Sequence, residues 1–280
     1  MKFTKMQGAG NDYLYIDARD IERDWERLSR DMSDRHFGVG SDGIILIQNS
    51  DTADLKMRMF NADGSEGEMC GNGIRCFTKY AIDREIVSSE NDSISVETLA
   101  GIREITPMFE NGNVVAARVS MGRPILSPES VPVTLNENIG YPVLQYPVTV
   151  CERTFNMGFV SMGNPHAVIF IDEPVEDFPL HSIGPVVENH KMFPNRVNFE
   201  IVNRLSDGTL KARVWERGSG ETMACGTGAC GIAVISRLLM YTQDRVDITL
   251  PGGMLTIEWD GQGEVFLEGP AKEVFVGEWD

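Results

Sequence analysis

Cys70-Gly71-Asn72-Gly73 and Cys225-Gly226-Thr227-Gly228 are two copies of one short sequence, and 155 residues (225 − 70) separate them. The same offset relates other residues without a gap: Gly8 and Gly163, Ile16 and Ile171, Asp17 and Asp172, Leu55-Lys56 and Leu210-Lys211, Arg58 and Arg213, and Glu66 and Glu221. A constant register over so long a stretch predicts two related halves, each with one Cys-Gly-x-Gly turn. Two such halves facing each other would place one thiol on each side of a cleft.

The length and the charge of the chain restrict what it can be. Its 280 residues are enough for two domains of ordinary size, and 42% of them are hydrophobic, as in globular proteins. The net charge of −17 argues against nucleic acids and anionic membranes as partners, because no basic surface is available. The first residues do not resemble a signal peptide, no uncharged run could span a membrane, and five cysteines, an odd number, favour reduced thiols. We therefore expect a cytoplasmic protein with no membrane and no nucleic-acid partner.

Hydrophobic periodicity predicts a similar order of elements in both halves. In the first half we expect strands at 3–6, 13–17, 43–48, 55–60, 93–98, 102–108 and 114–121, and helices at 21–32, capped by Asp20, and at 73–84. In the second half we expect strands at 167–171, 197–202 and 210–215, and helices at 180–189 and 229–240. The helix at 229–240 is apolar nearly all round, which predicts burial on every side.

The predicted fold is an α/β fold of the α+β type with two pseudosymmetric domains. Each domain is expected to be a mostly antiparallel mixed sheet curved around a central helix, the one that follows its Cys-Gly-x-Gly turn. The proline-rich segment 121–148 is the expected crossing between the halves, which places the domains at 1–121 and 122–270. The last segment, 271–280, has no counterpart in the repeat and is expected to return to the first domain.

Each Cys-Gly-x-Gly turn precedes a predicted helix, which makes Cys70 and Cys225 candidates for chemistry. Unpaired backbone N–H groups and the helix dipole favour negative charge at a helix N-terminus, and glycine allows a ligand to approach the backbone. A cysteine in that position is expected to have a lowered pKa and to act as a base, while the N–H groups hold a carboxylate. The plain alternative is a small buried hydrophobic residue, and this is the interpretation for Cys76, Cys151 and Cys230.

Other polar residues stand at repeat-related positions in predicted loops. His166, which follows Gly163-Asn164-Pro165, is at the repeat position of Asn11. Glu216-Arg217 replaces Asn61-Ala62 after the equivalent strand, and an arginine there can bind a carboxylate through two hydrogen bonds. Two glycine patterns, at 38–43 and 226–231, match the dinucleotide fingerprint only in the wrong structural context, and no metal-binding spacing is present. We therefore expect no nucleotide and no metal.

These stretches resemble the diaminopimelate epimerase family, and the resemblance covers essentially the whole chain. It rests on Gly8-Ala9-Gly10-Asn11-Asp12, Phe60-Asn61-Ala62-Asp63-Gly64-Ser65, Cys70-Gly71-Asn72-Gly73-Ile74-Arg75-Cys76, Gly163-Asn164-Pro165-His166, Trp215-Glu216-Arg217-Gly218 and Ala224-Cys225-Gly226-Thr227-Gly228. The resemblance implies two pseudosymmetric α/β domains, a two-cysteine mechanism and no cofactor.

The resemblance also implies roles for individual residues. Cys70 and Cys225 resemble the acid–base pair of the family, and His166 and Glu216 resemble the residues that assist it. The residues that resemble substrate ligands are Asn11, Asn61, Asn164, Asn198, Glu216 and Arg217, and those that resemble the cradle for the reacting carboxylate are Gly71, Asn72, Gly226 and Thr227. The chain departs from the family at Gly43, where many members carry glutamine, so one side-chain contact near the site has no counterpart here.

The expected function is cofactor-independent epimerisation of LL-diaminopimelate to meso-diaminopimelate, in lysine and peptidoglycan precursor biosynthesis. One cysteine, as the thiolate, would remove the α-proton of this small-molecule substrate, and the other, as the thiol, would deliver a proton to the opposite face. A proline or hydroxyproline epimerase is the alternative with the same fold, and a thiol redox protein is the alternative from another class. The sequence leaves the oligomeric state open, and a homodimer is one assembly compatible with it.

Overall fold

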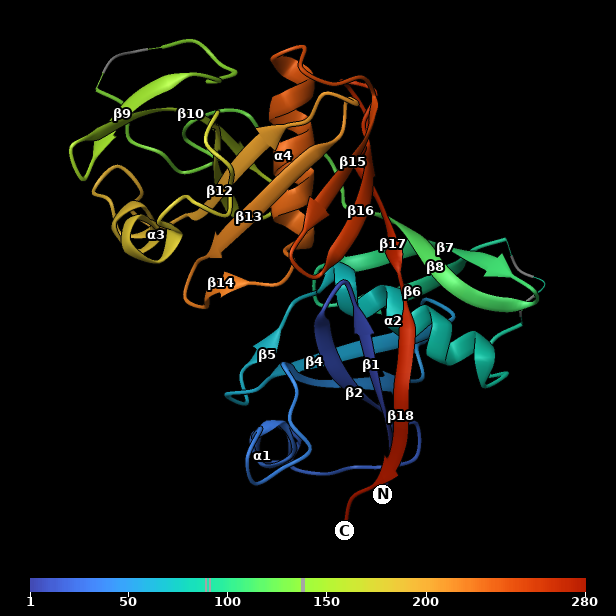
Figure 1. Cartoon of the computed structure of the whole chain (residues 1–280). Coiled ribbons are helices and arrows are strands. Elements are labelled where there is room, and N and C mark those ends of the chain that lie inside the picture. The colour runs from blue at the N-terminus through green and yellow to red at the C-terminus, as the bar shows by residue number, and fades with distance from the viewer. Residues whose placement is uncertain (89, 91, 137–138) are drawn as a thin grey trace. The chain divides into compact units, whose positions relative to one another are not determined.

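The computed structural model describes residues 1–88, 90, 92–136 and 139–280, and these divide into two compact units (Figure 1). Unit 1 consists of Met1–Ser120 and Glu268–Asp280, and unit 2 consists of Met121–Leu267. The chain thus passes between the units after Ser120 and after Leu267, whereas the sequence analysis placed the domain boundaries after residues 121 and 270. Residues 137 and 138 of the expected crossing segment lie outside the described residues.

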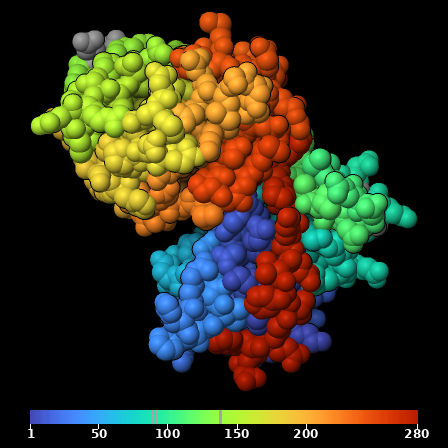
Figure 2. All heavy atoms as spheres, in the orientation of Figure 1, coloured from blue at the N-terminus to red at the C-terminus, as the bar shows by residue number. Residues whose placement is uncertain are grey.

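Within its described residues, unit 1 contains a mixed, mostly antiparallel sheet and two helices. Its elements are β1 (Lys2–Gly8), β2 (Asn11–Asp17), α1 (Trp25–Ser33), β3 (Gly43–Gln48), β4 (Leu55–Asn61), β5 (Glu66–Gly67), α2 (Gly71–Asp83), β6 (Ile94–Thr98), β7 (Gly101–Glu110), β8 (Asn113–Ser120) and β18 (Lys272–Glu278). Adjacent strands follow the order β18–β1–β2–β3–β4–β6–β7–β8, in which β2/β3 and β4/β6 are parallel and the other pairs antiparallel. Figure 2 shows the C-terminal residues lying over the N-terminal strands of this unit.

Side chains alternate along each strand, so the sheet of unit 1 has two apolar faces. On one face, Ile44 of β3 belongs to a core cluster with Trp25 of α1. On the other face, α2 covers Ile45, because a Cβ placed on Gly73 would lie 2.6 Å from Ile45 Cδ1. Since α2 also contacts β1, β2, β7 and β8, it is the central helix of this unit.

The start of α1 differs from the prediction. The helix begins at Trp25 and is capped by Asp24, whose carboxylate accepts the Arg27 N–H at 3.1 Å. The predicted cap, Asp20, lies in a turn before the helix, so that prediction was wrong. Asp24 is the carboxylate directly before the buried face of the helix, whereas Ile21 reaches only the edge of the core cluster.

Unit 2 repeats this arrangement. Its elements are β9 (Tyr146–Val150), β10 (Arg153–Ser161), β11 (Pro165–Phe170), α3 (Leu180–Glu188), β12 (Asn198–Arg204), β13 (Leu210–Glu216), β14 (Gly220–Thr222), α4 (Gly226–Leu238), β15 (Arg245–Leu250) and β16 (Gly253–Glu258), and β17 (Phe266–Pro270) contains the boundary between the units. The strand order is β9–β10–β11–β12–β13–β15–β16, again with two parallel pairs, β11/β12 and β13/β15. The predicted fold class, with a mixed sheet and a central helix in each of two pseudosymmetric halves, is confirmed.

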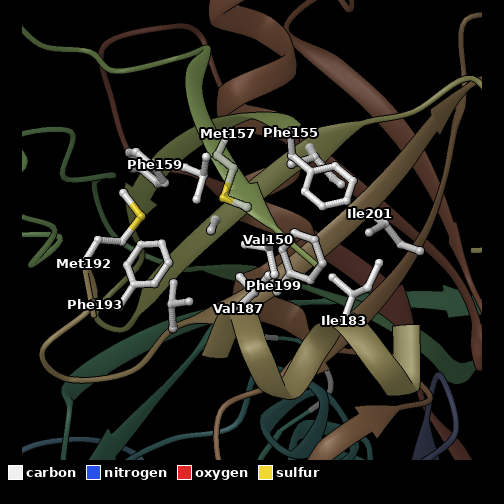
Figure 3. Close-up of a cluster of buried hydrophobic side chains, with 14 of the residues drawn as sticks. Val150, Phe155, Met157, Phe159, Ile183, Val187, Met192, Phe193, Phe199 and Ile201 are labelled. Carbon is white, nitrogen blue, oxygen red and sulfur yellow. The ribbon is translucent and has the colours of Figure 1, made fainter. Parts of the chain in front are cut away.

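The helices of unit 2 cover opposite faces of its sheet. Figure 3 shows Ile183 and Val187 of α3 in one apolar cluster with Phe199 and Ile201 of β12. The other face is covered by α4, which contacts β10, β11, β12 and β16. Burial of α4 is confirmed as far as Ser236, but the prediction was wrong for the end of the segment. The helix ends at Leu238, and Met240 beyond it is 85% exposed.

The C-terminal strand completes unit 1 in the way that β9 completes unit 2. β18 pairs antiparallel with β1, and β9 pairs antiparallel with β10, the counterpart of β1 in the repeat, so β18 and β9 occupy equivalent edges of the two sheets. The sequence did not predict β9 because Pro147 interrupts it, although an edge strand tolerates proline. Cys151, predicted to be buried, is exposed in the turn between β9 and β10, where its φ of +49° marks a tight turn.

None of the described helices combines the length and the apolar character that a membrane-spanning helix requires.

Candidate active site

Cys70 and Cys225 occupy equivalent positions at the N-termini of the two central helices. Each is the N-cap residue with an extended backbone, and each sulfur accepts the N–H of the glycine three residues later. The N···S distance is 3.4 Å from Gly73 to Cys70 and 3.3 Å from Gly228 to Cys225. The helices begin at Gly71 and Gly226, two to three residues earlier than predicted, so the glycines themselves form the first turn.

Cys70 is held in a polar network of unit 1. Its thiol donates to Asn11 Oδ1 at 3.2 Å, and Asn11 Nδ2 donates to Asp42 Oδ2 at 2.6 Å. The same Asp42 oxygen accepts the Asp12 N–H at 3.0 Å, and its other oxygen accepts from Arg35 at 2.9 Å. Sequence reasoning noted Asp42 only as part of the glycine pattern at 38–43 and missed its contact with Asn11.

The polar residues next to Cys70 in sequence lie in the first turn of α2. Gly71 and Asn72 are buried there. Asn61 stands at the end of β4, opposite Gly43 of β3, and its Nδ2 donates to Ser65 Oγ at 3.0 Å.

Gly43 has a backbone that disfavours a side chain. Its φ is +154°, and a Cβ there would lie 2.1 Å from the carbonyl oxygen of Phe60. The glutamine expected from the family resemblance therefore does not fit this backbone.

Cys225 lies in a different environment from Cys70. It is buried, and its sulfur is 3.4 Å from the hydroxyl of Thr227. Burial raises the pKa of the Cys225 thiol well above its usual range, and the nearby carboxylates of Glu216 and Glu200 raise it further. The expectation of a lowered pKa was wrong for this thiol, because burial and two carboxylates outweigh the helix N-terminus.

His166 connects β11 to β12 through a buried pair. Its Nδ1 lies 2.6 Å from Glu200 Oε1, and its Nε2 lies 2.9 Å from Asn164 Oδ1. Both His166 and Glu200 are fully buried, and burial raises the pKa of the Glu200 carboxyl although His166 acts in the opposite direction. Sequence reasoning missed Glu200, for which a carboxylate within the apolar predicted strand 197–202 was the available signal.

The turn after β13 is held by contacts from three directions. Asn198 Oδ1 accepts the Arg217 N–H at 2.9 Å, and Asn198 Nδ2 donates to Pro165 O at 2.8 Å. Glu188 of α3 accepts the Gly218 N–H at 2.9 Å. The Glu216 carboxylate accepts from the Thr222 hydroxyl at 2.5 Å.

Arg217 itself is exposed, and its guanidinium donates to the carbonyl oxygen of Asn195 at 3.0 Å.

The predicted site residues are divided between the two units. Unit 1 contains Asn11, Asn61, Cys70, Gly71 and Asn72, and unit 2 contains Asn164, His166, Asn198, Glu216, Arg217, Cys225, Gly226 and Thr227. Among the described residues, no three His, Cys, Asp or Glu side chains are arranged to hold a metal ion.

Solved structures of other proteins share this fold. A probable proline racemase from Agrobacterium radiobacter has a TM-score of 0.69 and 13% identity, and the match covers 100% of this chain and 92% of that one. A hydroxyproline epimerase from Agrobacterium vitis has a TM-score of 0.66 and 12% identity, with 99% and 91% covered. A phenazine biosynthesis protein of the PhzF family from Bacillus anthracis has a TM-score of 0.69 and 16% identity, with 99% and 98% covered. At these identities the likeness concerns the fold alone.

Comparisons of sequence are more specific. The sequence profile of the family described as Diaminopimelate epimerase matches residues 3–127 and 158–274. A diaminopimelate epimerase from Methanococcus maripaludis is 51% identical, and the match covers 100% of both chains. Proteins of the same name from Agathobacter rectalis and Acetivibrio thermocellus are 50% and 47% identical, and each match covers 100% of this chain and 99% of the relative. The chain therefore belongs to the diaminopimelate epimerase family.

Proposed function

We propose that this protein epimerises LL-diaminopimelate to meso-diaminopimelate with two cysteines as its acid and base and without a cofactor. The observation that carries the proposal is the pair Cys70 and Cys225, each capping the central helix of its unit within the same glycine frame. Membership of the diaminopimelate epimerase family supports the choice of substrate.

In the proposed reaction, one cysteine acts as a thiolate and removes the α-proton of one stereocentre. The other cysteine acts as a thiol and returns a proton to the opposite face, and the roles exchange in the reverse direction. Negative charge that develops on the α-carboxylate would be stabilised by backbone N–H groups of the first helical turns, including those of Asn72 and Thr227.

Formation of a thiolate at Cys225 requires that the pKa of this residue falls when substrate binds. The raised pKa of Cys225 means that this residue is a thiol in the free protein at neutral pH. Part of the increase in the pKa of Cys225 comes from the negative charge of Glu216. A substrate ammonium group beside Glu216 would therefore lower the pKa of Cys225. We assign His166 and Glu216 to this assisting role, and Cys70 is held by Asn11 as described above.

Substrate recognition distinguishes diaminopimelate from cyclic amino acids. We assign Asn11, Asn61, Asn164, Asn198 and Arg217 to binding, and the exposed guanidinium of Arg217 to the distal carboxylate. Proline and hydroxyproline have no distal carboxylate, so Arg217 would have no role in an enzyme for those substrates.

The decisive experiment is proton exchange in deuterated water. The protein is incubated separately with LL-diaminopimelate, L-proline and trans-4-hydroxy-L-proline, and loss of the α-proton is followed by NMR together with the ratio of stereoisomers. We expect exchange and epimerisation with diaminopimelate alone. Exchange with proline or hydroxyproline instead would identify the alternative epimerase, and thiol–disulfide turnover without any exchange would identify a redox protein.

Variants test the two-cysteine assignment. Cys70→Ala and Cys225→Ala are each expected to lose nearly all epimerisation, because one thiol cannot serve both faces of the carbon. Cys76→Ala, which changes a buried packing residue, and Cys151→Ala, which changes an exposed turn residue, are the matched controls and should stay active. A Cys70 or Cys225 variant with near wild-type turnover would overturn the mechanism.

The setting of the reaction is part of the proposal. We assign the enzyme to lysine and peptidoglycan precursor biosynthesis in the cytoplasm, as the family resemblance implies. We also propose a homodimer, which light scattering of the purified protein would test through its molar mass.

A further inference from the structure

Glu200 occupies in unit 2 the place that Ile45 occupies in unit 1. The two positions are 155 residues apart (200 − 45), and their partners on the next strand, Val214 and Met59, are separated by the same offset. Both side chains are fully buried beneath the first turn of the central helix. A Cβ on Gly73 would lie 2.6 Å from Ile45 Cδ1, and a Cβ on Gly228 would lie 3.0 Å from Glu200 Oε1.

The neighbouring strand differs in the same way, because unit 2 again has a titratable side chain where unit 1 has a group that does not titrate. Asn11 of unit 1 corresponds to His166 of unit 2, and His166 forms the 2.6 Å contact with Glu200. Unit 1 therefore has an amide and an aliphatic side chain beside its cysteine, whereas unit 2 has two titratable groups that are both fully buried. A buried charge is unfavourable unless it is neutralised, so the two buried titratable groups of unit 2 must compensate each other.

The pair can stay electrically neutral by holding one proton between His166 Nδ1 and Glu200 Oε1. Imidazolium with carboxylate and imidazole with carboxylic acid are both neutral overall, and both leave a proton on Nε2 for the hydrogen bond to Asn164 Oδ1 at 2.9 Å. Glu200 Oε2 makes no hydrogen bond of good geometry with the described residues, and the backbone of Ala167 gives the carboxylate only weak support, so a free carboxylate would be poorly compensated.

The shared proton affects thiolate formation at Cys225 because Glu200 of the pair lies close to this cysteine. The titratable groups that face Glu200 are His166 on β11, Glu216 at the end of β13 and Cys225 at the N-cap of α4. If the pair lost its proton, its net negative charge would oppose formation of a thiolate at Cys225. Cys70 has no such pair beneath it, because Ile45 stands at the equivalent place.

We propose that Glu200 is a positioning residue that keeps a shared proton on His166, fixes Asn164 through the second ring nitrogen, and gives the Cys225 half a pH response that the Cys70 half lacks. This inference rests on the proposed function, in which Cys225 transfers a proton and Asn164 binds substrate. Glu200 acts through His166 and does not touch the reacting atoms.

The test compares Glu200→Gln with Glu200→Ile and with Ile45→Leu. Gln preserves the size of the side chain but cannot hold the shared proton, and Ile reproduces the packing of unit 1. We expect both Glu200 variants to stay folded and to lose about 10- to 100-fold in kcat, the range typical for loss of a group that orients a functional ligand. Ile45→Leu, the control at the equivalent position, should keep wild-type kcat.

The pH profile of kcat separates positioning from packing. In the wild type the alkaline limb combines ionisation of the pair with that of Cys225. In Glu200→Gln we expect a single ionisation displaced to lower pH, because the carboxylate that opposes the Cys225 thiolate is gone. An active Glu200→Gln variant with the wild-type profile would overturn the inference.

A measurement without substrate distinguishes failure of this inference from failure of the proposed function. The ring ¹⁵N shifts of His166 report its protonation directly. We expect these shifts to stay constant between about pH 5 and 8 in the wild type, the range in which an ordinary histidine side chain changes its charge, and to move in Glu200→Gln. Identical His166 shifts in both proteins would overturn the shared proton even in an active enzyme, whereas an inactive wild type would overturn the proposed function alone.

Discussion

The thiol of Cys70 donates a hydrogen bond to Asn11 Oδ1 at 3.2 Å, and the opposite end of the same amide is held by Asp42 at 2.6 Å. A carboxylate can only accept, so Asp42 fixes which end of the Asn11 amide faces the sulfur. An amide NH₂ facing the sulfur would instead favour the thiolate. Asp42 therefore orients the group that accepts from the Cys70 thiol without contacting the sulfur.

Asp42→Ala is expected to lower kcat/KM for LL-diaminopimelate by about tenfold, equivalent to about 1.4 kcal/mol, because the Asn11 amide is no longer oriented. The measurement is steady-state epimerisation at about pH 7.5, with the wild type assayed in parallel. Asp17→Ala is the matched control, since Asp17 ends β2, the strand that Asn11 begins, and forms an ion pair with the partly exposed Arg19. A kcat/KM for Asp42→Ala equal to that of the control would contradict the orienting role.

Gly43 provides a prediction about stability. Gly43→Ala places a Cβ 2.1 Å from Phe60 O on a backbone with φ of +154°, so backbone must move. Gly112→Ala has the same disfavoured sign of φ, at +81°, but no atom within 4 Å of the new Cβ. We expect about 1 kcal/mol of destabilisation at Gly112 and about 2–4 kcal/mol at Gly43, where overpacking adds to the backbone cost. Thermal melting compares the two, and equal melting temperatures would show that the Phe60 contact relaxes freely.

The repeat made much of the fold predictable from the sequence. The central helices span 71–83 and 226–238, and β4 and β13 span 55–61 and 210–216, so both pairs keep the offset of 155 residues at each end. Periodicity within one half could therefore be checked against the other half. The strand β9 had no repeat to check it against, because its place in unit 1 is taken by β18, from the other end of the chain.

The candidate site was predictable only where a residue type indicates its own chemistry. Cys70, Cys225 and His166 could be selected on that basis. Asp42 and Glu200 could not, because their importance depends on which side chain the fold places within hydrogen-bond distance. The raised pKa of Cys225 escaped prediction for the same reason, since burial and neighbouring carboxylates depend on the packing of distant segments.

Arg217 tests the assignment of substrate recognition. Arg217→Met should lower kcat/KM for diaminopimelate by about 10- to 100-fold, because a charged contact with the distal carboxylate is lost. The melting temperature should change little, since Arg217 is exposed and the turn is held through its backbone by Asn198. Arg204→Met is the control, because Arg204 of the same unit packs over Tyr241. An unchanged kcat/KM would remove Arg217 from the proposed site.

The ion pair of Arg213 and Glu221 predicts how stability depends on pH. Two hydrogen bonds of 2.7 and 2.9 Å from Arg213 hold the pKa of Glu221 below its ordinary value of 4.5. A carboxyl whose pKa is lower in the folded state stabilises the fold above the unfolded pKa, and this stabilisation is lost as the pH falls through the folded pKa. Glu221→Gln should therefore melt below the wild type at pH 7, and the difference should shrink as the pH falls below about 4.

Unit 1 supplies the control for this prediction, because Arg58 and Glu66 form the repeat-related ion pair. The side chains of Arg58 and Glu66 are 29% and 30% exposed, against 15% and 18% for Arg213 and Glu221. More exposed pairs contribute less, typically about 0–1 kcal/mol, so Glu66→Gln should lower the melting temperature by less than Glu221→Gln at pH 7. A Glu221→Gln difference that stays constant down to about pH 3 would mean that the carboxylate charge does not stabilise the fold, and the variant would then report lost packing alone.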